Sequence, residues 1–214
     1  MNSNEKKFLD LKITEIKKEL SKKELFEIIN LVKEENTHAL VSHLNKRLIK
    51  EYLTIAIKSN NIFLYVLKRK NNIIGYALYA KNQDYLIKDF YSIRYKILLN
   101  LIFRLKLFTL INILLAISKL DSIFLNKNVD LKRNCLNLNL LAVKKKFQSN
   151  GFGKYFFNKT IKIIYNKIFK FRFVTCEAPT VGSVNFYLKK NNFKLVGKKI
   201  RITNNLTVLK KKIN

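Results

Sequence analysis

The chain has 214 residues, of which 48% are apolar and 12% aromatic, so it can bury a sizeable core and is not disordered in general. It carries 43 basic and 14 acidic residues, and the net charge of +29 attracts polyanions such as nucleic acid, anionic membranes or phosphorylated small molecules. The two cysteines, Cys135 and Cys176, have no Cys or His cluster near them in the sequence, which excludes a disulfide framework and a zinc site.

The kind of basic residue argues against nucleic acid as the main partner. The chain has 36 lysines but only 7 arginines, together with 26 asparagines, a bias that an A/T-rich genome produces whatever the protein does. Nucleic-acid readers favour arginine because its planar guanidinium binds phosphates and guanine edges with two hydrogen bonds. The first 20 residues carry charges at short intervals and lack an apolar core, so we expect no secretory signal and a cytoplasmic protein.

Helix and strand signals place the elements in the order α α β β β α β α β β. Ser21 followed by Glu24 is the capping-box pattern at a helix start, and Asn71-Asn72 is a turn between two strands of a hairpin. The expected helices are residues 22–35, 42–58, 152–168 and 181–190, and the expected strands are residues 62–70, 73–80, 135–143, 171–177, 193–199 and 205–212. This order predicts an α/β fold with one mixed sheet, in a single domain covering residues 1–214.

A helical insertion of about residues 84–131 separates the hairpin from the central strand. Residues 97–117 are almost all Leu, Ile and Phe, but Arg104 and Lys106 interrupt them, and a charge at the centre of a membrane-spanning helix costs about 2.5–3.5 kcal/mol. The uncharged run after Lys106 is only about half the length that a span needs. We expect the insertion to cover the substrate side of the domain, and we leave open a peripheral membrane contact or a homodimer contact.

The segment LLAVKKKFQSNGFGKYFF, residues 140–157, carries the clearest chemical signal. An apolar strand ends at Val143, and Gln148-x-x-Gly151-x-Gly153 then opens a helix. Backbone N–H groups at a helix start are unpaired and lie at the positive end of the helix dipole, and glycine lets phosphate oxygens approach them. The segment therefore predicts a site for a diphosphate. It does not fit the dinucleotide fingerprint, because Phe156 occupies the third glycine position.

The same segment resembles the acetyl-CoA pyrophosphate loop of the GNAT superfamily of N-acyltransferases. A second motif about thirty residues further on, Ser183-x-x-Phe186-Tyr187 followed by Phe193, is similar to the other signature of the superfamily, a helix that ends in Phe-Tyr before a strand. The expected order of elements from about residue 62 to residue 212 is also similar to that fold. The resemblance implies a GNAT-like N-acetyltransferase domain that uses acetyl-CoA as co-substrate and no metal.

The resemblance also implies roles for individual residues. The Leu141 N–H would polarise the thioester carbonyl, and Tyr187 would protonate the departing thiolate. The amine would attack directly in a ternary complex, so that most of the rate would come from positioning. The residues expected to bind the pantetheine arm and the pyrophosphate are Leu141, Ala142, Val143, Gln148, Ser149, Asn150, Gly151, Phe152, Gly153, Lys154 and Thr180.

The chain departs from the superfamily where many relatives carry a catalytic Glu, because Asn137 stands there and an amide is not a base. Glu177, the only acid after Asp130, is the expected catalytic base, and a structural ion pair with a lysine is the alternative interpretation. His38 and His43 are further candidates for the base, and Asp84 and Asp89 are candidates to bind the ammonium of the acceptor. Proton removal by water without a dedicated base is also open. Asn192 replaces the usual Gly before Phe193, at a left-handed turn that Asn tolerates.

Together these features predict an N-acetyltransferase that moves an acetyl group from acetyl-CoA to a primary amine of a small acceptor. Residues 131–214 hold 20 basic residues and one acid, so we expect an anionic acceptor such as an amino-sugar nucleotide or an amino acid. Two other classes stay open. One is a degenerate GNAT-fold protein that binds CoA without catalysis, and the other is a basic protein that binds RNA or membrane surfaces.

Overall fold

The structure is a computed structural model that describes residues 8–82, 85, 88–103, 108, 110–111, 134–199 and 205–213. It has the mixed α/β architecture expected from the sequence. The strands are β1 (Leu11–Ile16), β2 (Ile62–Arg69), β3 (Asn72–Ala80), β4 (Cys135–Val143), β5 (Phe173–Ala178), β6 (Lys194–Lys199) and β7 (Leu206–Lys212). The helices are α2 (Lys22–Glu35), α3 (Lys46–Lys58), α5 (Arg94–Phe103), α7 (Phe152–Lys167) and α8 (Val181–Asn191), with 3₁₀ turns η1 (Leu40–His43), η2 (Tyr91–Ile93) and η4 (Lys145–Phe147).

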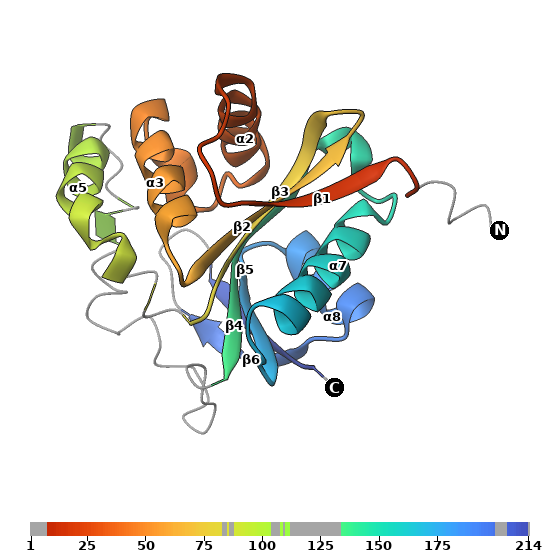
Figure 1. The fold of residues 1–214 in the computed structure, drawn as a ribbon. Helices are drawn as coiled ribbons and strands as arrows, with labels where there is room; N and C mark the ends of the chain where they lie inside the picture. Colours follow the sequence, from red (N-terminus) through yellow and green to blue (C-terminus); the bar gives the residue numbers. More distant parts are fainter. Residues whose placement is uncertain are drawn as a thin grey trace.

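The strands form one mixed sheet (Figure 1), whose order is β1-β2-β3-β4-β5-β7-β6. Among the strands described, β4 and β5 are the parallel neighbours, and α7 connects them as a crossover, while the other neighbours are antiparallel. The parallel ladder is short. It begins where Cys135 pairs with Phe173 and ends where Leu138 pairs with Cys176. The carboxyl end of β4 therefore lies at the centre of the sheet, next to the start of α7.

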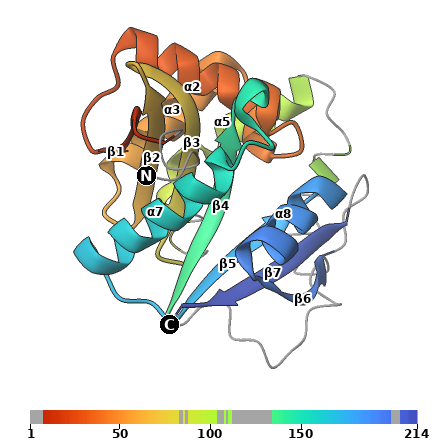
Figure 2. The ribbon, with the colours of Figure 1, turned by 90° about the vertical axis from the view of Figure 1, so that its right-hand side faces the viewer.

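Helices cover both faces of the sheet, and each face has its own apolar core (Figure 2). The α2 and α3 helices pack on one face, and α7 and α8 pack on the other. The central strand β4 contributes to both cores, since Leu138 belongs to the α7 side and Leu140 to the α2 side. A bulge explains the change of side. Leu78 of β3 pairs with Leu140 and Tyr79 pairs with Leu138, which leaves Asn139 as the extra residue.

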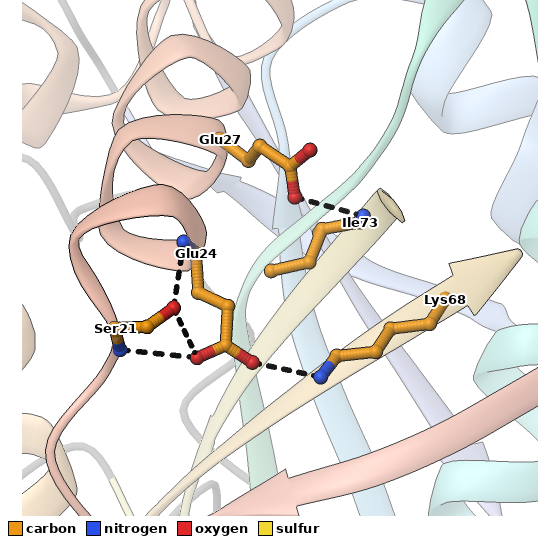
Figure 3. Close-up of polar contacts among 5 residues, drawn as sticks. All are labelled: Ser21, Glu24, Glu27, Lys68 and Ile73. Atoms are coloured by element: carbon orange, nitrogen blue, oxygen red, sulfur yellow. Dashed lines mark hydrogen bonds and ion pairs between the residues drawn. The ribbon is translucent and has the colours of Figure 1, made fainter. Parts of the chain in front are cut away.

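The capping box predicted at Ser21 begins α2 and also fastens it to the hairpin (Figure 3). Ser21 Oγ accepts a hydrogen bond from the Glu24 N–H at 3.2 Å, and the Glu24 carboxylate accepts one from the Ser21 N–H at 3.0 Å. The other carboxylate oxygen of Glu24 accepts from Lys68 Nζ on β2 at 2.7 Å. One turn later, Glu27 accepts from the Ile73 N–H on β3 at 3.0 Å. Two acids of one helix therefore hold α2 across the β2–β3 hairpin.

The structure corrects three expectations about the N-terminal half. The predicted order lacked β1, which forms the outer strand of the sheet beside β2. The hairpin turn lies at Lys70-Asn71, whose φ angles are 47° and 64°, one residue before the expected position. The second helix begins at Lys46 instead of residue 42, because η1 intervenes and Asn45 caps the helix. The other expected bounds agree with the structure to within two residues.

Part of the expected insertion is described. The α5 helix lies beside α3, where Lys96 Nζ contacts the Glu51 carboxylate at 2.8 Å and the Asn45 N–H donates to Asn100 Oδ1 at 3.3 Å. Within the described ranges, no helix combines the length and the apolar character that crossing a membrane requires. Residues 112–133 and parts of 83–111 fall outside the described ranges. The extent of the domain and of the insertion, and the membrane or dimer contact, stay predictions.

Candidate functional site

Strands β4 and β5 diverge at the centre of the sheet (Figure 2). Their ladder ends at the pair Leu138 and Cys176, but β4 continues to Val143. Over these last residues β4 pairs with β3 alone among the described strands. One edge of β4 is therefore open, and an open strand edge can pair with the peptide-like arm of a ligand.

The peptide groups of β4 alternate between this open edge and β3. The Lys144 N–H donates to Ile74 O at 2.8 Å, so Lys144 faces β3. Successive residues of an antiparallel strand point their peptide groups to opposite sides, so Ala142 also faces β3, whereas Leu141 and Val143 face the open edge. The Leu141 N–H is therefore placed as expected. The main chain of Ala142 belongs to the β3 ladder instead, which corrects its expected contact with the pantetheine arm.

The α7 helix begins without a capping side chain. Gly151 is the N-cap residue, and its φ of 84° lies in the left-handed region that favours glycine. The neighbouring long helices do have side-chain caps, from Ser21 for α2, Asn45 for α3 and Thr180 for α8. Within the described residues, the first-turn N–H groups of Gly153 and Lys154 have no acceptor. A helix start of this kind suits an anion, as the sequence predicted.

A hollow of about 500 Å³ opens beside this turn. It is lined by Phe8, Ser149, Asn150, Gly151, Lys154, Tyr155 and Asn158. Phe8 and Tyr155 stack with their ring centres 4.7 Å apart, and the tip of the Phe8 ring would lie 3.6 Å from a Cβ at position 151. The segment that precedes β1 therefore supplies an aromatic wall of the hollow. No sequence pattern had connected Phe8 with this loop.

Gln148 has a different role from the expected contact with a pyrophosphate. Its Nε2 donates to Val143 O at 2.8 Å and to the Glu35 carboxylate at 2.7 Å, which uses both amide hydrogens. Its backbone N–H donates to Lys145 O at 3.0 Å. Glu35, the last residue of α2, also accepts from the Lys145 N–H at 2.8 Å. Gln148 therefore braces the loop against α2, and the N–H groups further along the loop are the candidate donors to a diphosphate.

Tyr187 lies on α8 with its ring in the core on the α7 side, where it is 7% exposed. Its ring packs edge to face against Phe157 and Phe193, with ring centres 6.3 and 5.2 Å away. Burial raises the pKa of Tyr187 well above its ordinary value of 10, because the phenolate would lose its hydration. The hydroxyl therefore keeps its proton at neutral pH.

Glu177 is held in an ion pair, with its Oε1 2.6 Å from Lys199 Nζ. The side chain of Lys199 is 8% exposed and that of Glu177 is 30% exposed. This is the structural partner that the sequence left open as the alternative interpretation. On the same face of the sheet, Asn137 Nδ2 donates to Thr175 Oγ1 at 3.2 Å, so the position that lacks a Glu holds a cross-strand hydrogen bond.

The two histidine candidates for the base lie in the connection between α2 and α3, where His38 is exposed and His43 is half-buried. Of the two acids expected to bind the ammonium of the acceptor, Asp89 accepts a hydrogen bond from the Ser59 hydroxyl, which ties the insertion to the end of α3. Asp84 lies outside the described residues.

Thr180 and Asn192 flank the α8 helix. Thr180 is the N-cap of α8, and its Oγ1 accepts from the Ser183 N–H at 3.1 Å, so its side chain is engaged at the place where a contact with CoA was expected. Asn192 ends α8 with φ 57° and ψ 38°, which confirms the left-handed turn expected there. Phe193 then begins its contacts in the core on the α7 side.

The cysteines and acids form no metal site in the described part of the chain. Cys135 and Cys176 are both buried and do not form a disulfide. They occupy opposite ends of the parallel ladder, because Cys135 pairs with Phe173 and Cys176 pairs with Leu138. Burial raises the pKa of the Cys176 thiol well above its ordinary value of 9, so it stays protonated.

The sequence interpretation missed two polar residues of the site, Glu35 and Asn139. No local pattern marks Glu35, because its partner Gln148 is 113 residues away in the chain. Asn139 had a usable signal. The strict alternation of apolar and polar residues in β4 breaks at Leu140-Leu141, and a break in a two-residue period indicates a bulge.

No protein-family model and no curated protein matches this sequence. Solved structures do match the fold. The PaiA N-acetyltransferase of Thermoplasma acidophilum, in complex with coenzyme A, is 14% identical with a TM-score of 0.52, over 94% of this chain and 99% of that one. The ribosomal-protein-S18-alanine N-acetyltransferase of Escherichia coli is 8% identical with a TM-score of 0.54, over 95% and 94%. A GNAT family acetyltransferase of Elizabethkingia anophelis with acetyl-CoA bound is 14% identical with a TM-score of 0.50, over 96% and 99%. The chain therefore has the fold of the GNAT acetyltransferases.

Proposed function

We propose that the chain is an N-acetyltransferase that moves the acetyl group of acetyl-CoA to a primary amine of a small anionic acceptor. The observation that carries the proposal is the divergence of β4 from β5 beside the uncapped start of α7. An extended ligand arm can pair with the open edge of β4 while its diphosphate takes the first-turn N–H groups of α7. Solved structures with the same fold contain coenzyme A or acetyl-CoA.

The groups assigned to the cofactor lie along the open edge of β4, in the loop before α7 and at the start of α8. The N–H groups of Gly153 and Lys154 would donate to the diphosphate, and the Lys154 side chain adds a positive charge. The Leu141 and Val143 N–H groups would donate to the pantetheine arm along the open edge. Bound acetyl-CoA supplies an acetyl group activated as a thioester. The residues that would hold it are Leu141, Val143, Ser149, Asn150, Gly151, Phe152, Gly153, Lys154 and Thr180.

In this proposal the protein contributes positioning and proton transfer. The Leu141 N–H stabilises negative charge on the thioester oxygen as the amine attacks. Tyr187, whose hydroxyl stays protonated, gives its proton to the departing thiolate. Glu177 is the candidate to receive the proton of the amine, directly or through water, and it must loosen its contact with Lys199 to do so. Release of that proton to water alone is the competing route.

The preference for an anionic acceptor follows from the same ion pair. Residues 131–214 contain one acid, Glu177, and Lys199 already neutralises it. A cationic acceptor would therefore meet lysines without a free counter-charge in this half of the chain. An acceptor that carries a carboxylate or phosphate is attracted by the same field, which supports an amino acid or an amino-sugar nucleotide as the substrate class.

Calorimetric titration with CoA, followed by an acetyl-transfer assay on a panel of amines, tests the proposal. We expect saturable CoA binding, and we expect Tyr187→Phe to retain that binding while kcat falls by about 10²–10⁴-fold. Tyr95→Phe, at an exposed tyrosine of α5, is the control and should change neither. Absence of CoA binding would overturn the proposal. CoA binding without turnover of any amine would identify a non-catalytic CoA-binding protein, and RNA binding without CoA binding would identify a basic RNA-binding protein.

A further inference from the structure

Asn139 lies at the point where β4 and β5 begin to diverge. It is the first β4 residue beyond the last pair of their ladder, Leu138 with Cys176. It is also the residue that the bulge leaves without a partner on β3, because the register shifts between Leu78 and Tyr79. Asn139 therefore has no strand partner on either side, at the level where the open edge of β4 begins.

The side chain of Asn139 carries an unsatisfied donor. Its Nδ2 is buried and has no hydrogen-bond partner in the described part of the chain. Asn137, two residues earlier on the same strand, differs in this respect, because its Nδ2 donates to Thr175 Oγ1 at 3.2 Å. A buried donor without an acceptor lowers the stability of the fold, and such groups are rare in native proteins. Asn139 Nδ2 therefore lacks a hydrogen-bond acceptor in the described part of the chain, and a ligand could supply one.

In the proposed complex, a thioester bound at the open edge of β4 would lie near Asn139. A strand advances about 3.3 Å per residue, so Asn139 lies about 7 Å along β4 from Leu141, whose N–H faces the open edge. An attacking amine must approach a thioester bound at Leu141. An oxygen on the carbon next to the amine carbon can then reach Asn139, because a hydrogen bond spans about 2.9 Å between nitrogen and oxygen.

We infer that Asn139 Nδ2 binds the carboxylate oxygen of an acceptor in which the carboxylate and the reacting amine share one carbon. The acceptor class is then an α-amino acid, and the inference rests on the proposed N-acetyltransferase function. An amine that lacks this oxygen leaves the Asn139 donor unpaired, and sites built to bond a substrate oxygen reject analogues without it. The positive field of residues 131–214 adds to the attraction of the carboxylate.

Three coenzyme A conjugates test the inference without requiring turnover. Each carries a sulfur-linked acetyl bridge in amide linkage to glycine, to glycinamide or to propylamine. We expect the protein to bind the glycine conjugate about tenfold more tightly than the propylamine conjugate, as one hydrogen bond to a charged group implies. A stronger preference for the glycinamide conjugate would indicate a peptide N-terminus and overturn the assignment of a free amino acid. Equal affinity for all three would overturn the role of Asn139 altogether.

Substitutions of Asn139 distinguish a role in binding the acceptor carboxylate from a role in stabilising the fold. Asn139→Leu and Asn139→Ala should abolish the preference while the affinity for CoA itself stays within twofold. Thr14→Val is the matched control, because Thr14 Oγ1 is another buried group without a partner among the described residues, on the outer strand β1. It should change none of the affinities. Asn139→Leu should not lower Tm, and a clear fall confined to that variant would reveal a partner within the protein and overturn the inference. If CoA does not bind at all, the proposed function has failed, whereas CoA binding without a preference refutes this inference alone.

Discussion

Gly151 holds the backbone conformation on which the proposed diphosphate site depends. Its φ of 84° is strained for any residue with a Cβ, although the nearest atom, on Phe8, would lie at an ordinary 3.6 Å. We expect Gly151→Ala to lower the free energy of unfolding by about 1 kcal/mol and to weaken CoA binding, because the first turn of α7 must reorient. Urea denaturation and CoA titration measure the two effects.

The matched control is Gly182→Ala on α8. Gly182 has no positive φ, and its nearest contact would be Thr180 Oγ1 at 3.9 Å. Alanine favours a helix over glycine, so this variant should gain about 0.5–1 kcal/mol of stability and bind CoA normally. Equal effects of the two substitutions would contradict the importance that we assign to the left-handed turn.

The pair of Glu177 and Lys199 lets a structural role be separated from a catalytic one. Both Glu177→Gln and Lys199→Met break the 2.6 Å contact, and we expect each to reduce stability, with a coupling of about 1–3 kcal/mol in a double-mutant cycle. Only Glu177→Gln removes the proton acceptor, so we expect kcat to fall in that variant and to persist in Lys199→Met. An equal loss of kcat in both variants would make the pair structural and favour water as the proton acceptor.

The α2 helix shows how an element is fixed by charge at its first turn. The hydrogen bond from Lys68 lowers the pKa of Glu24 below its ordinary value of 4.5. A carboxyl whose pKa is lower in the folded state stabilises the fold above pH 4.5, and this contribution is lost as the pH falls through the folded-state pKa. We expect the stability difference between wild type and Glu24→Gln to shrink between pH 6 and pH 3. Urea denaturation at each pH measures it.

Glutamine at position 24 is a suitable replacement because it can still complete the capping box with Ser21. The difference between the two proteins therefore reports the contact with Lys68 more than the loss of the helix cap. Glu34→Gln, at an exposed position of the same helix, controls for the removal of one carboxylate. A difference between wild type and Glu24→Gln that is constant with pH would contradict the role of Lys68.

The elements that could be predicted are those whose signals are local. The capping box at Ser21, the apolar run of β4 and the glycines before α7 each fixed a helix or strand to within two residues. The features that could not be predicted depend on contacts between residues that lie far apart in the sequence. The β1 strand is stabilised by pairing with β2, and the contact of Glu35 with Gln148 joins residues 113 apart. The loop between β4 and α7 was thus located correctly in the chain, while the partner that braces it was not.

At the scale of the whole molecule, the acids of the first half serve mainly to hold the sheet and the loop. Three carboxylates of α2 do this. Glu24 contacts Lys68, Glu27 accepts from the backbone of β3, and Glu35 accepts from the loop before α7. In the second half, the single acid, Glu177, forms an ion pair with Lys199. These four carboxylates are therefore engaged within the protein, and most of the net charge of +29 is left to act on solutes.

This distribution predicts which acceptors the protein turns over. We expect kcat/KM to be higher for an acidic amino acid or an amino-sugar nucleotide than for spermidine, because the positive field attracts the anions and repels the polyamine. The preference should decrease as salt is raised from 0.05 to 0.5 M, since mobile ions screen the field over about 10 Å or less. Initial rates with each acceptor at the two salt concentrations measure both effects.

A neutral amine of similar size serves as the control, because its turnover should change little with salt. If spermidine were the better substrate at low salt, a local acid would have to outweigh the surrounding lysines, and the charge of the chain would not select the acceptor.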